Sequence, residues 1–283
     1  MSGPFHESDQ SLPIHLSEDP TALRGLTFLN TRDAQGAERL TRLLVKTGGR
    51  VIEKPMLVFA PPVSWEPFDS RLADLQQGDW VIFTSATAVR STLARLKTLN
   101  KDMLALSVAK VAAVGKSTAT TLRDVGLMVD LVPERFQAEE LLEALIPLLQ
   151  QDDRVWFPRA EKGRETLVEG LRAHGVHVDM TPVYRTVPPE GGLGQVAEMM
   201  RKKEVDWLLF TSSLTVEHFL NKLQQEPDGT KLASHCRVGC IGQITAQTAK
   251  DNGLKVEVVP EQQDLPGLVE ALIAHVRSDN HRS

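Results

Sequence analysis

The sequence predicts an α/β protein with two similar parallel-sheet domains. Three observations predict this fold class. The chain repeats itself at a constant offset, short β-rich runs alternate with helical patterns in each copy, and paired prolines interrupt both copies at the same place. At 283 residues, 41% apolar and 24% charged, the chain is long enough to build two cores of ordinary size.

The internal repeat has an offset of 127 residues. The segment FTSATAV at 83–89 returns as FTSSLTV at 210–216, and Asp79-Trp80 returns as Asp206-Trp207. The same offset relates Gly115 to Gly242 without a gap. Because chance does not keep one register over such a length, we interpret the chain as a duplication.

Short β-rich runs recur in both copies and predict the strands. In the first copy they lie at 26–31, 51–57, 80–84, 111–114 and 129–132; in the second they lie at 155–158, 176–184, 207–211, 238–241 and 256–259. Apolar residues recur at helical spacing between these runs, as in Leu40 and Leu44 or Val89, Leu93 and Leu96. Strands that alternate with helices form parallel sheets covered on both faces, so we expect a flavodoxin-like sheet in each domain.

The proline pairs Pro61-Pro62 and Pro188-Pro189 predict where the chain crosses between the domains. A boundary between complete copies would fall near 150–154, which contains neither proline nor glycine. We therefore expect an interleaved path with a two-stranded connector that can act as a hinge. The predicted parts are a disordered lead at 1–24, one domain of 25–57 plus 189–276, a second domain of 62–183, and connectors at 58–61 and 184–188. A tandem arrangement, in which each copy folds alone, stays the alternative.

Composition excludes several classes of function. The formal net charge of −5 argues against a broad nucleic-acid surface, although a local basic cleft stays compatible with it. No apolar run approaches the roughly 18 residues of a membrane span, and the first residues do not resemble a signal peptide. We therefore expect a cytoplasmic protein that binds neither nucleic acid nor membrane.

No cofactor or metal site is predicted. Cys236 and Cys240 lack the spacing and the second ligand pair of a zinc site, so we expect buried thiols. His174 and His177 straddle Gly175 at a predicted turn. The stretch GLGQVA at 192–197 mimics a dinucleotide-binding fingerprint, but it follows a linker, and no acidic residue ends a strand about 20 positions later. Without a conventional nucleophile, an enzyme of this kind would act mainly by binding and orienting its substrate.

Candidate site residues lie where the predicted strands lead into helices, because ligands bind beyond the carboxyl ends of parallel strands. They are Ser85, Thr118, Ser212, Ser213 and Thr245. Helix capping alone would explain all of them. The functional alternative is that several helix N-termini present N–H groups and positive dipole ends to an anionic ligand.

Arginine and tyrosine side chains add to this set. Arg32 and Arg159 occupy equivalent strand ends, Arg164 follows one helical turn later, and each could hold a carboxylate with two hydrogen bonds. The alternative is a solvated surface position. Tyr184 is the single tyrosine of the chain, and we expect its hydroxyl to face the cleft between the domains, with simple packing as the alternative.

Taken together, these segments resemble the uroporphyrinogen-III synthase family over about residues 26–276. The resemblance is carried by TFLNTRDAQGAERL, the two FTS segments, WFPRAEKGRETLVEGLRAHGVHVDMTPVYRTV and CIGQITAQTAKDNGLKVEVVPEQQDLPGLVEAL. It implies two parallel-sheet domains formed by an interleaved chain, with the substrate in the cleft between them. That substrate is hydroxymethylbilane, a linear tetrapyrrole with eight carboxylates. The implied reaction closes the ring with loss of water and inverts the terminal pyrrole through a spiro intermediate, without a cofactor.

The resemblance also implies roles for single residues. Tyr184 would assist departure of the substrate hydroxyl, and Ser85, Ser212 and Thr245 would contact carboxylates. The last loop reads GQITA where the family is often rich in proline and threonine, which leaves the roles of Gln243 and Ile244 open. A monomeric, cytoplasmic lyase of porphyrin biosynthesis is expected, with transient contact to the enzyme that makes hydroxymethylbilane.

Two other functions stay open at this point. A two-domain sensor that closes on an anion without chemistry would share the hinge, the helix ends and the arginines. A transferase that uses a nucleotide would need a phosphate loop, which the sequence lacks.

Overall fold

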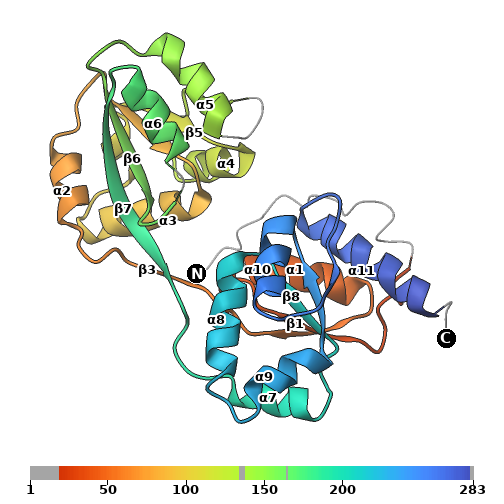
Figure 1. Ribbon diagram of the computed structural model, residues 1–283. Helices are drawn as coiled ribbons and strands as arrows, with labels where there is room; N and C mark the ends of the chain where they lie inside the picture. The colour runs from red at the N-terminus through yellow and green to blue at the C-terminus, as the bar shows by residue number, and fades with distance from the viewer. Residues whose placement is uncertain (1–18, 134–137, 164, 281–283) are drawn as a thin grey trace, which may run out of the picture. The chain divides into compact units, whose positions relative to one another are not determined.

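A computed structural model describes residues 19–133, 138–163 and 165–280. The chain divides into two compact units. Unit 1 combines Met1–Val58 with Pro188–Ser283, and unit 2 is Phe59–Val187. The chain therefore passes from one unit to the other twice, after Val58 and after Val187 (Figure 1).

Unit 1 contains a five-stranded sheet in the order β10-β9-β8-β1-β2. Its strands are β1 (Thr27–Asn30), β2 (Arg50–Glu53), β8 (Trp207–Phe210), β9 (Arg237–Cys240) and β10 (Val256–Val258). All neighbouring strands pair in parallel. Counted along the chain within the unit, this order is the flavodoxin-like order 2-1-3-4-5.

Helices cover both faces of this sheet. They are α1 (Ala34–Lys46), α7 (Gly194–Arg201), α8 (Ser213–Leu223), α9 (Gly229–Leu232), α10 (Gln243–Asp251) and α11 (Leu265–Asn280). Side chains alternate along the central strand β8: Trp207 packs with α1 and α11, and Phe210 packs with α7, α8 and α10. Figure 1 shows α1 beside α11, with α7 and α9 across the strands from them. The core of unit 1 thus consists of two apolar layers, one on each face of the sheet.

Unit 2 contains a second five-stranded sheet, in the order β3-β7-β6-β4-β5. Its strands are β3 (Val58–Ala60), β4 (Trp80–Phe83), β5 (Lys110–Ala113), β6 (Arg154–Ala160) and β7 (His177–Val187). Its helices are α2 (Glu66–Ala73), α3 (Ala86–Thr98), α4 (Lys116–Asp124), α5 (Ala138–Leu145) and α6 (Thr166–Ala173).

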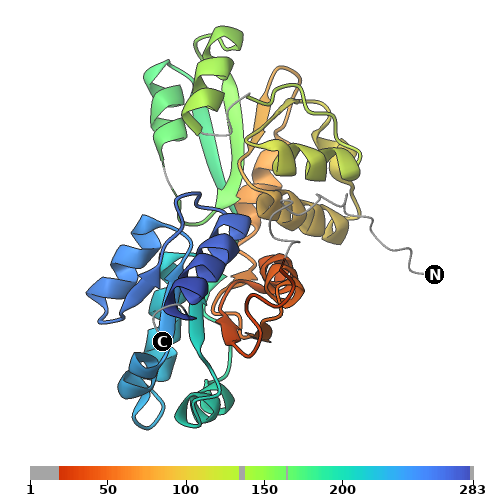
Figure 2. The ribbon, with the colours of Figure 1, turned by 90° about the vertical axis from the view of Figure 1, so that its right-hand side faces the viewer.

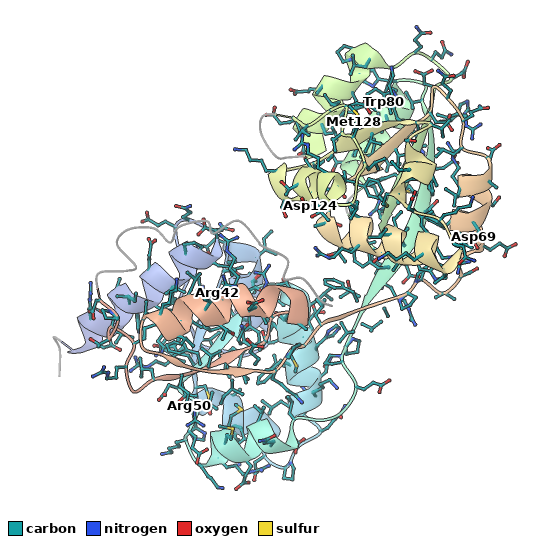
Figure 3. The ribbon with its side chains drawn as sticks, turned by 180° about the vertical axis from the view of Figure 1, so that it is seen from behind. Arg42, Arg50, Asp69, Trp80, Asp124 and Met128 are labelled. Atoms are coloured by element: carbon teal, nitrogen blue, oxygen red, sulfur yellow. The ribbon has the colours of Figure 1, made fainter. Side chains whose placement is uncertain are left out.

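The core of unit 2 is also divided by its sheet. Val81 and Phe83 of β4 pack with the layer that holds α3 and α4, and Trp80 and Ile82 pack with the layer that holds α5 and α6. Figure 2 shows α5 and α6, in green, on one face and α3 and α4, in yellow, on the other. The labelled Trp80 lies inside this unit in Figure 3. The predicted α/β class with two parallel sheets is confirmed.

Residues that the 127-residue offset relates pair with equivalent partners in the two sheets. Trp80 of β4 lies opposite Val155 of β6, and Trp207 of β8 lies opposite Phe28 of β1. Likewise β4 meets β5 at Trp80 and Lys110, and β8 meets β9 at Trp207 and Arg237. Duplication as the origin of this likeness stays a prediction.

Three strand predictions were wrong in extent. The run at 129–132 makes only an isolated bridge between Leu131 and Ala112, because the Asp130 carboxylate accepts the Val111 N–H that a neighbouring strand would otherwise bind. The strand in the run at 51–57 ends at Glu53, and the next strand, β3, begins only at Val58 and belongs to the other sheet. The run at 176–184 continues to Val187, because β3 pairs beside β7 and extends it through most of the predicted connector.

Candidate functional site

The fold gathers the candidate residues at one edge of each sheet. In unit 2, Ser85 follows β4, Gly115 follows β5 and Arg159 lies near the end of β6, and these three strands are neighbours. In unit 1, Arg32, Ser212 and Gly242 follow the neighbouring strands β1, β8 and β9. Since parallel strands end at the same edge, each unit presents one set of candidates at the edge where ligands of this fold class bind.

Ser85 and Ser212 begin helices. The Ser85 hydroxyl accepts a hydrogen bond from the Ala88 N–H at 3.1 Å and starts α3. The Ser212 hydroxyl accepts one from the Thr215 N–H at 3.3 Å and starts α8. Both side chains are therefore N-caps, as the capping alternative predicts. The Ser85 hydroxyl can donate its proton to a further partner, whereas the Ser212 hydroxyl lies 3.5 Å from the Thr215 hydroxyl and donates to it.

The other hydroxyl candidates are engaged or buried. Ser213 accepts a 2.7 Å hydrogen bond from the Thr248 hydroxyl, which links α8 to α10. Thr118 of α4 and Thr245 of α10 are almost fully buried. What these two helices present to a ligand is therefore chiefly their backbone. Each begins at a glycine, Gly115 or Gly242, without a side-chain cap, and the N–H groups in the first turn of a helix are a favourable place for an anion.

Arg159 is buried, and none of the described carboxylates pairs with it. Only 7% of this residue is exposed. Its Nε donates to the Ala160 carbonyl at 3.2 Å, and its Nη1 lies 3.5 Å from the Met180 sulfur. The guanidinium also stacks over the Phe157 ring, 5.3 Å from its centroid. No carboxylate among the described residues pairs with it, and a buried positive charge is costly unless an anion neutralises it.

Two other arginines illustrate the usual pairing with a carboxylate. Arg42 pairs with Glu38 at 2.7 Å on the exposed face of α1, and Arg95 donates to Asp69 from α3 to α2. Figure 3 labels Arg42 and Asp69. Such surface pairs contribute little to stability and are already neutral. The contrast makes Arg159 the strongest anion-binding candidate among the arginines that the structure describes.

Arg32 is partly neutralised. Its Nε is buried without a hydrogen bond and lies 3.6 Å from Asp33 Oδ2, while Asp33 Oδ1 accepts the Gly36 N–H at 2.9 Å and caps α1. The Asp33 carboxylate is therefore shared between the arginine and the helix start. Arg164 lies outside the described residues.

Tyr184 lies in β7, next to Phe59 of β3. Its ring is half-buried, meets the Phe59 ring edge to face, and packs at the border of the core layer that holds α3 and α4. Among the described residues nothing hydrogen-bonds to its hydroxyl. Packing therefore explains the position of the ring but not the presence of the hydroxyl group.

The described residues form no metal-binding cluster, and neither cysteine among them has a reactive thiol. No group of three or more His, Cys, Asp or Glu side chains gathers there in a way that could hold a metal ion. Burial raises the pKa of the Cys236 and Cys240 thiols from 9.0 to about 12, so neither is a ready nucleophile.

No helix among the described residues is long and apolar enough to cross a membrane.

Sequence reasoning missed the neighbours that shape the site. Met180 and Phe157 hold Arg159, and Gln263 reaches Gly242, where a Cβ atom would lie 2.3 Å from the Gln263 Oε1. No sequence signal marks these residues, because each is brought to the site by pairing or packing of distant segments. The offset of 127 residues also relates Gly36 to Gly163, but the sequence does not indicate that these glycines lie against the arginines.

Comparisons with known proteins point to one family. The family model described as uroporphyrinogen-III synthase HemD matches residues 38–270. The chain is 32% identical over 260 residues to a uroporphyrinogen-III synthase of Synechococcus elongatus, covering 91% of this chain and 97% of that one.

Solved structures show a similar fold. A mutant uroporphyrinogen III synthase of Thermus thermophilus has a TM-score of 0.56 at 22% identity and covers 89% of this chain and 99% of its own. A uroporphyrinogen-III synthetase of Helicobacter pylori has a TM-score of 0.57 at 18% identity with the same coverage.

Proposed function

The chain belongs to the uroporphyrinogen-III synthase family, and we propose that it converts hydroxymethylbilane into uroporphyrinogen III. The match of residues 38–270 to the family model carries this proposal. The resemblance first seen in the sequence is thereby confirmed at the level of the family. Nothing in the comparisons supports the alternative of an anion-binding sensor.

The proposed reaction is a cyclisation with net loss of one water. The C–O bond of the terminal hydroxymethyl group breaks, assisted by the electron-rich pyrrole, and leaves a stabilised cation. The substituted carbon of the far terminal ring attacks that cation and forms the spiro intermediate. One bond of this intermediate then breaks, and the ring closes at the free position with loss of a proton. We therefore place the enzyme among the cyclising lyases.

Carboxylate binding is the proposed task of the two sheet edges. In unit 2 the Arg159 guanidinium lacks a carboxylate partner among the described residues, and the backbone of α4 begins at Gly115 without a side-chain cap. In unit 1 the start of α10 at Gly242 offers the same kind of donor, and Arg32 adds a charge. Guanidinium groups and helix N-termini both bind carboxylates well, so a chain of net negative charge can hold an octacarboxylate.

Hydroxyl side chains complete the proposed contacts. Ser85 and Ser212 accept N–H groups of their own helices. Ser85 can donate its proton to a substrate carboxylate, and Ser212 can do so in place of its 3.5 Å bond to the Thr215 hydroxyl. Ser213 lies one residue further on and bonds with Thr248. Thr118 and Thr245 contribute through the backbone at their helix starts, since their side chains are buried.

Tyr184 is proposed as the general acid for the departing hydroxyl. Its ring is held by Phe59, while the described residues leave its hydroxyl without a hydrogen bond. Proton donation at the oxygen as the C–O bond breaks would turn a poor leaving group into water. We assign the remaining selectivity to orientation, because a preference of 100 to 1 for the inverted product needs a difference of about 2.7 kcal/mol between two barriers.

The deciding experiment mixes the purified protein with freshly generated hydroxymethylbilane, oxidises the products and separates type I from type III uroporphyrin. We expect type III to predominate without an added cofactor. Type I alone, formed at the spontaneous rate, would reject the enzyme and favour the sensor. We further propose a cytoplasmic monomer without a nucleic-acid partner, which meets the enzyme that releases hydroxymethylbilane only transiently.

A further inference from the structure

Two glycines lie against the two candidate arginines. A Cβ atom at Gly163 would lie 2.4 Å from Arg159 Nη2, and one at Gly36 would lie 2.1 Å from Arg32 Nε. Real Cβ atoms do not approach other heavy atoms this closely. In both units, therefore, the guanidinium occupies the space that a side chain four residues later would fill.

Backbone conformation does not require glycine at either position. Neither Gly36 nor Gly163 has a positive φ, so an L side chain would not be strained there. Gly36 also lies in the first turn of α1, where glycine forms helix less readily than alanine. Space for the arginine is the physical reason that remains.

The clash at Gly163 falls on the atom of Arg159 that none of the described residues binds. Nε donates to the Ala160 carbonyl, Nη1 approaches the Met180 sulfur, and no described residue bonds to Nη2. A methyl group at position 163 would therefore cover or displace the terminal nitrogen that stays open to an external acceptor.

We propose that Gly163 and Gly36 are positioning residues that keep Arg159 and Arg32 in place to bind substrate carboxylates. This inference rests on the proposed function. In each unit, one arginine would bind the anion and one glycine would keep that arginine in position. In unit 2 the glycine also leaves Nη2 of Arg159 accessible.

The proposal separates positioning from stability. The clashing atom is the far end of a flexible side chain, which can turn away at little cost to the fold. Gly163→Ala should therefore leave the melting temperature nearly unchanged while it moves the guanidinium. Gly194→Ala is the matched control, because its nearest contact, to Glu226 Oε1, is an ordinary 3.8 Å and its φ is not positive.

The test combines kinetics with a binding measurement. For Gly163→Ala we expect KM for hydroxymethylbilane to rise about tenfold, the effect of losing one charge-assisted hydrogen bond, with kcat within about twofold. The dissociation constant of uroporphyrin III, an octacarboxylate probe followed by its fluorescence, should rise by the same factor. Arg159→Met should show both changes, and Gly163→Ala should add nothing in the Arg159→Met background. Gly194→Ala should match the parent.

The outcomes keep the two proposals apart. Unchanged KM and unchanged uroporphyrin binding in Gly163→Ala, or a full further loss in the double variant, overturn the positioning role even if the parent makes type III product. If the parent binds uroporphyrin with this pattern but forms no type III product, the positioning role stands and the proposed function fails. If the parent neither binds uroporphyrin nor forms type III product, both are rejected.

Discussion

The ring of Tyr184 meets the ring of Phe59 edge to face, with centroids 5.3 Å apart. The contact joins β7 to β3, the two strands at which the chain passes between the units. The contact involves only the ring of the tyrosine, so packing of the ring and the proposed chemistry of the hydroxyl can be tested separately.

Tyr184→Phe removes only the hydroxyl. We expect kcat to fall about tenfold or more, because a general acid contributes at least that much, while the ring contact and the melting temperature persist. Steady-state formation of type III product and thermal unfolding check the two parts. Tyr184→Leu is the comparison that loses the edge-to-face contact as well. Unchanged turnover in Tyr184→Phe would remove the tyrosine from the mechanism.

Ser85 allows capping to be separated from substrate binding. Ser85→Ala loses the bond to the Ala88 N–H, so the free energy of unfolding should fall by about 1 kcal/mol. Ser85→Asp should restore the cap and the stability, but its charge should repel a substrate carboxylate and raise KM several-fold. Urea unfolding and KM for hydroxymethylbilane measure the two effects. If KM stays at the parent value in Ser85→Asp, the serine is a cap alone.

A buried ion pair in unit 2 predicts a large loss of stability. Arg71 Nη2 donates to Asp79 Oδ2 at 2.8 Å, and both residues are almost fully buried. Asp79→Ala leaves the buried arginine with only the half-exposed Asp179, whose Oδ2 lies 2.9 Å from Arg71 Nε, so we expect about 2–3 kcal/mol of destabilisation in urea unfolding. Glu38→Ala breaks the exposed pair with Arg42 and should cost less than about 1 kcal/mol. Equal losses in the two variants would contradict this account.

The two thiols predict a pH dependence. Burial raises the pKa of Cys236 and Cys240 to about 12, so the folded protein keeps both thiols protonated where an unfolded chain ionises them. Iodoacetamide at pH 9 should therefore label neither thiol in the folded state and both in urea. The folded state binds more protons between about pH 9 and 12, so the thiol contribution to stability is complete below pH 9 and falls above it. Rapid labelling of the folded protein would refute the burial.

The sequence alone determined the fold class, because that depends on local pattern. Runs such as Trp80–Phe83 and Trp207–Phe210 are apolar throughout and buried on both faces, as strands of a covered parallel sheet must be. The helix starts after these strands could also be predicted, because serine, found at positions 85 and 212, is a common N-cap residue. Family membership followed from the order and spacing of many such segments.

Strand ends and neighbours depended on partners that are distant in the chain. The run at 129–132 reads as a strand, yet the Asp130 side chain takes the Val111 N–H, and only a bridge forms. β7 continues past residue 184, where its end was predicted, because β3 pairs beside it. Hydrogen-bond competition of this kind involves residues that no local pattern connects.

The tertiary structure decided what each candidate side chain can do. Arg32 and Arg159 look alike in the repeat, but Arg32 shares the Asp33 carboxylate, whereas Arg159 is buried beside Met180 with no carboxylate among the described residues. The role of Gly163 appears only when a Cβ atom is placed at that position and meets Nη2. A sequence specifies which charges and spaces are available. Folding decides which charge finds a carboxylate and which side chain occupies each space, because both depend on the atoms that the other strands and helices bring to the same place.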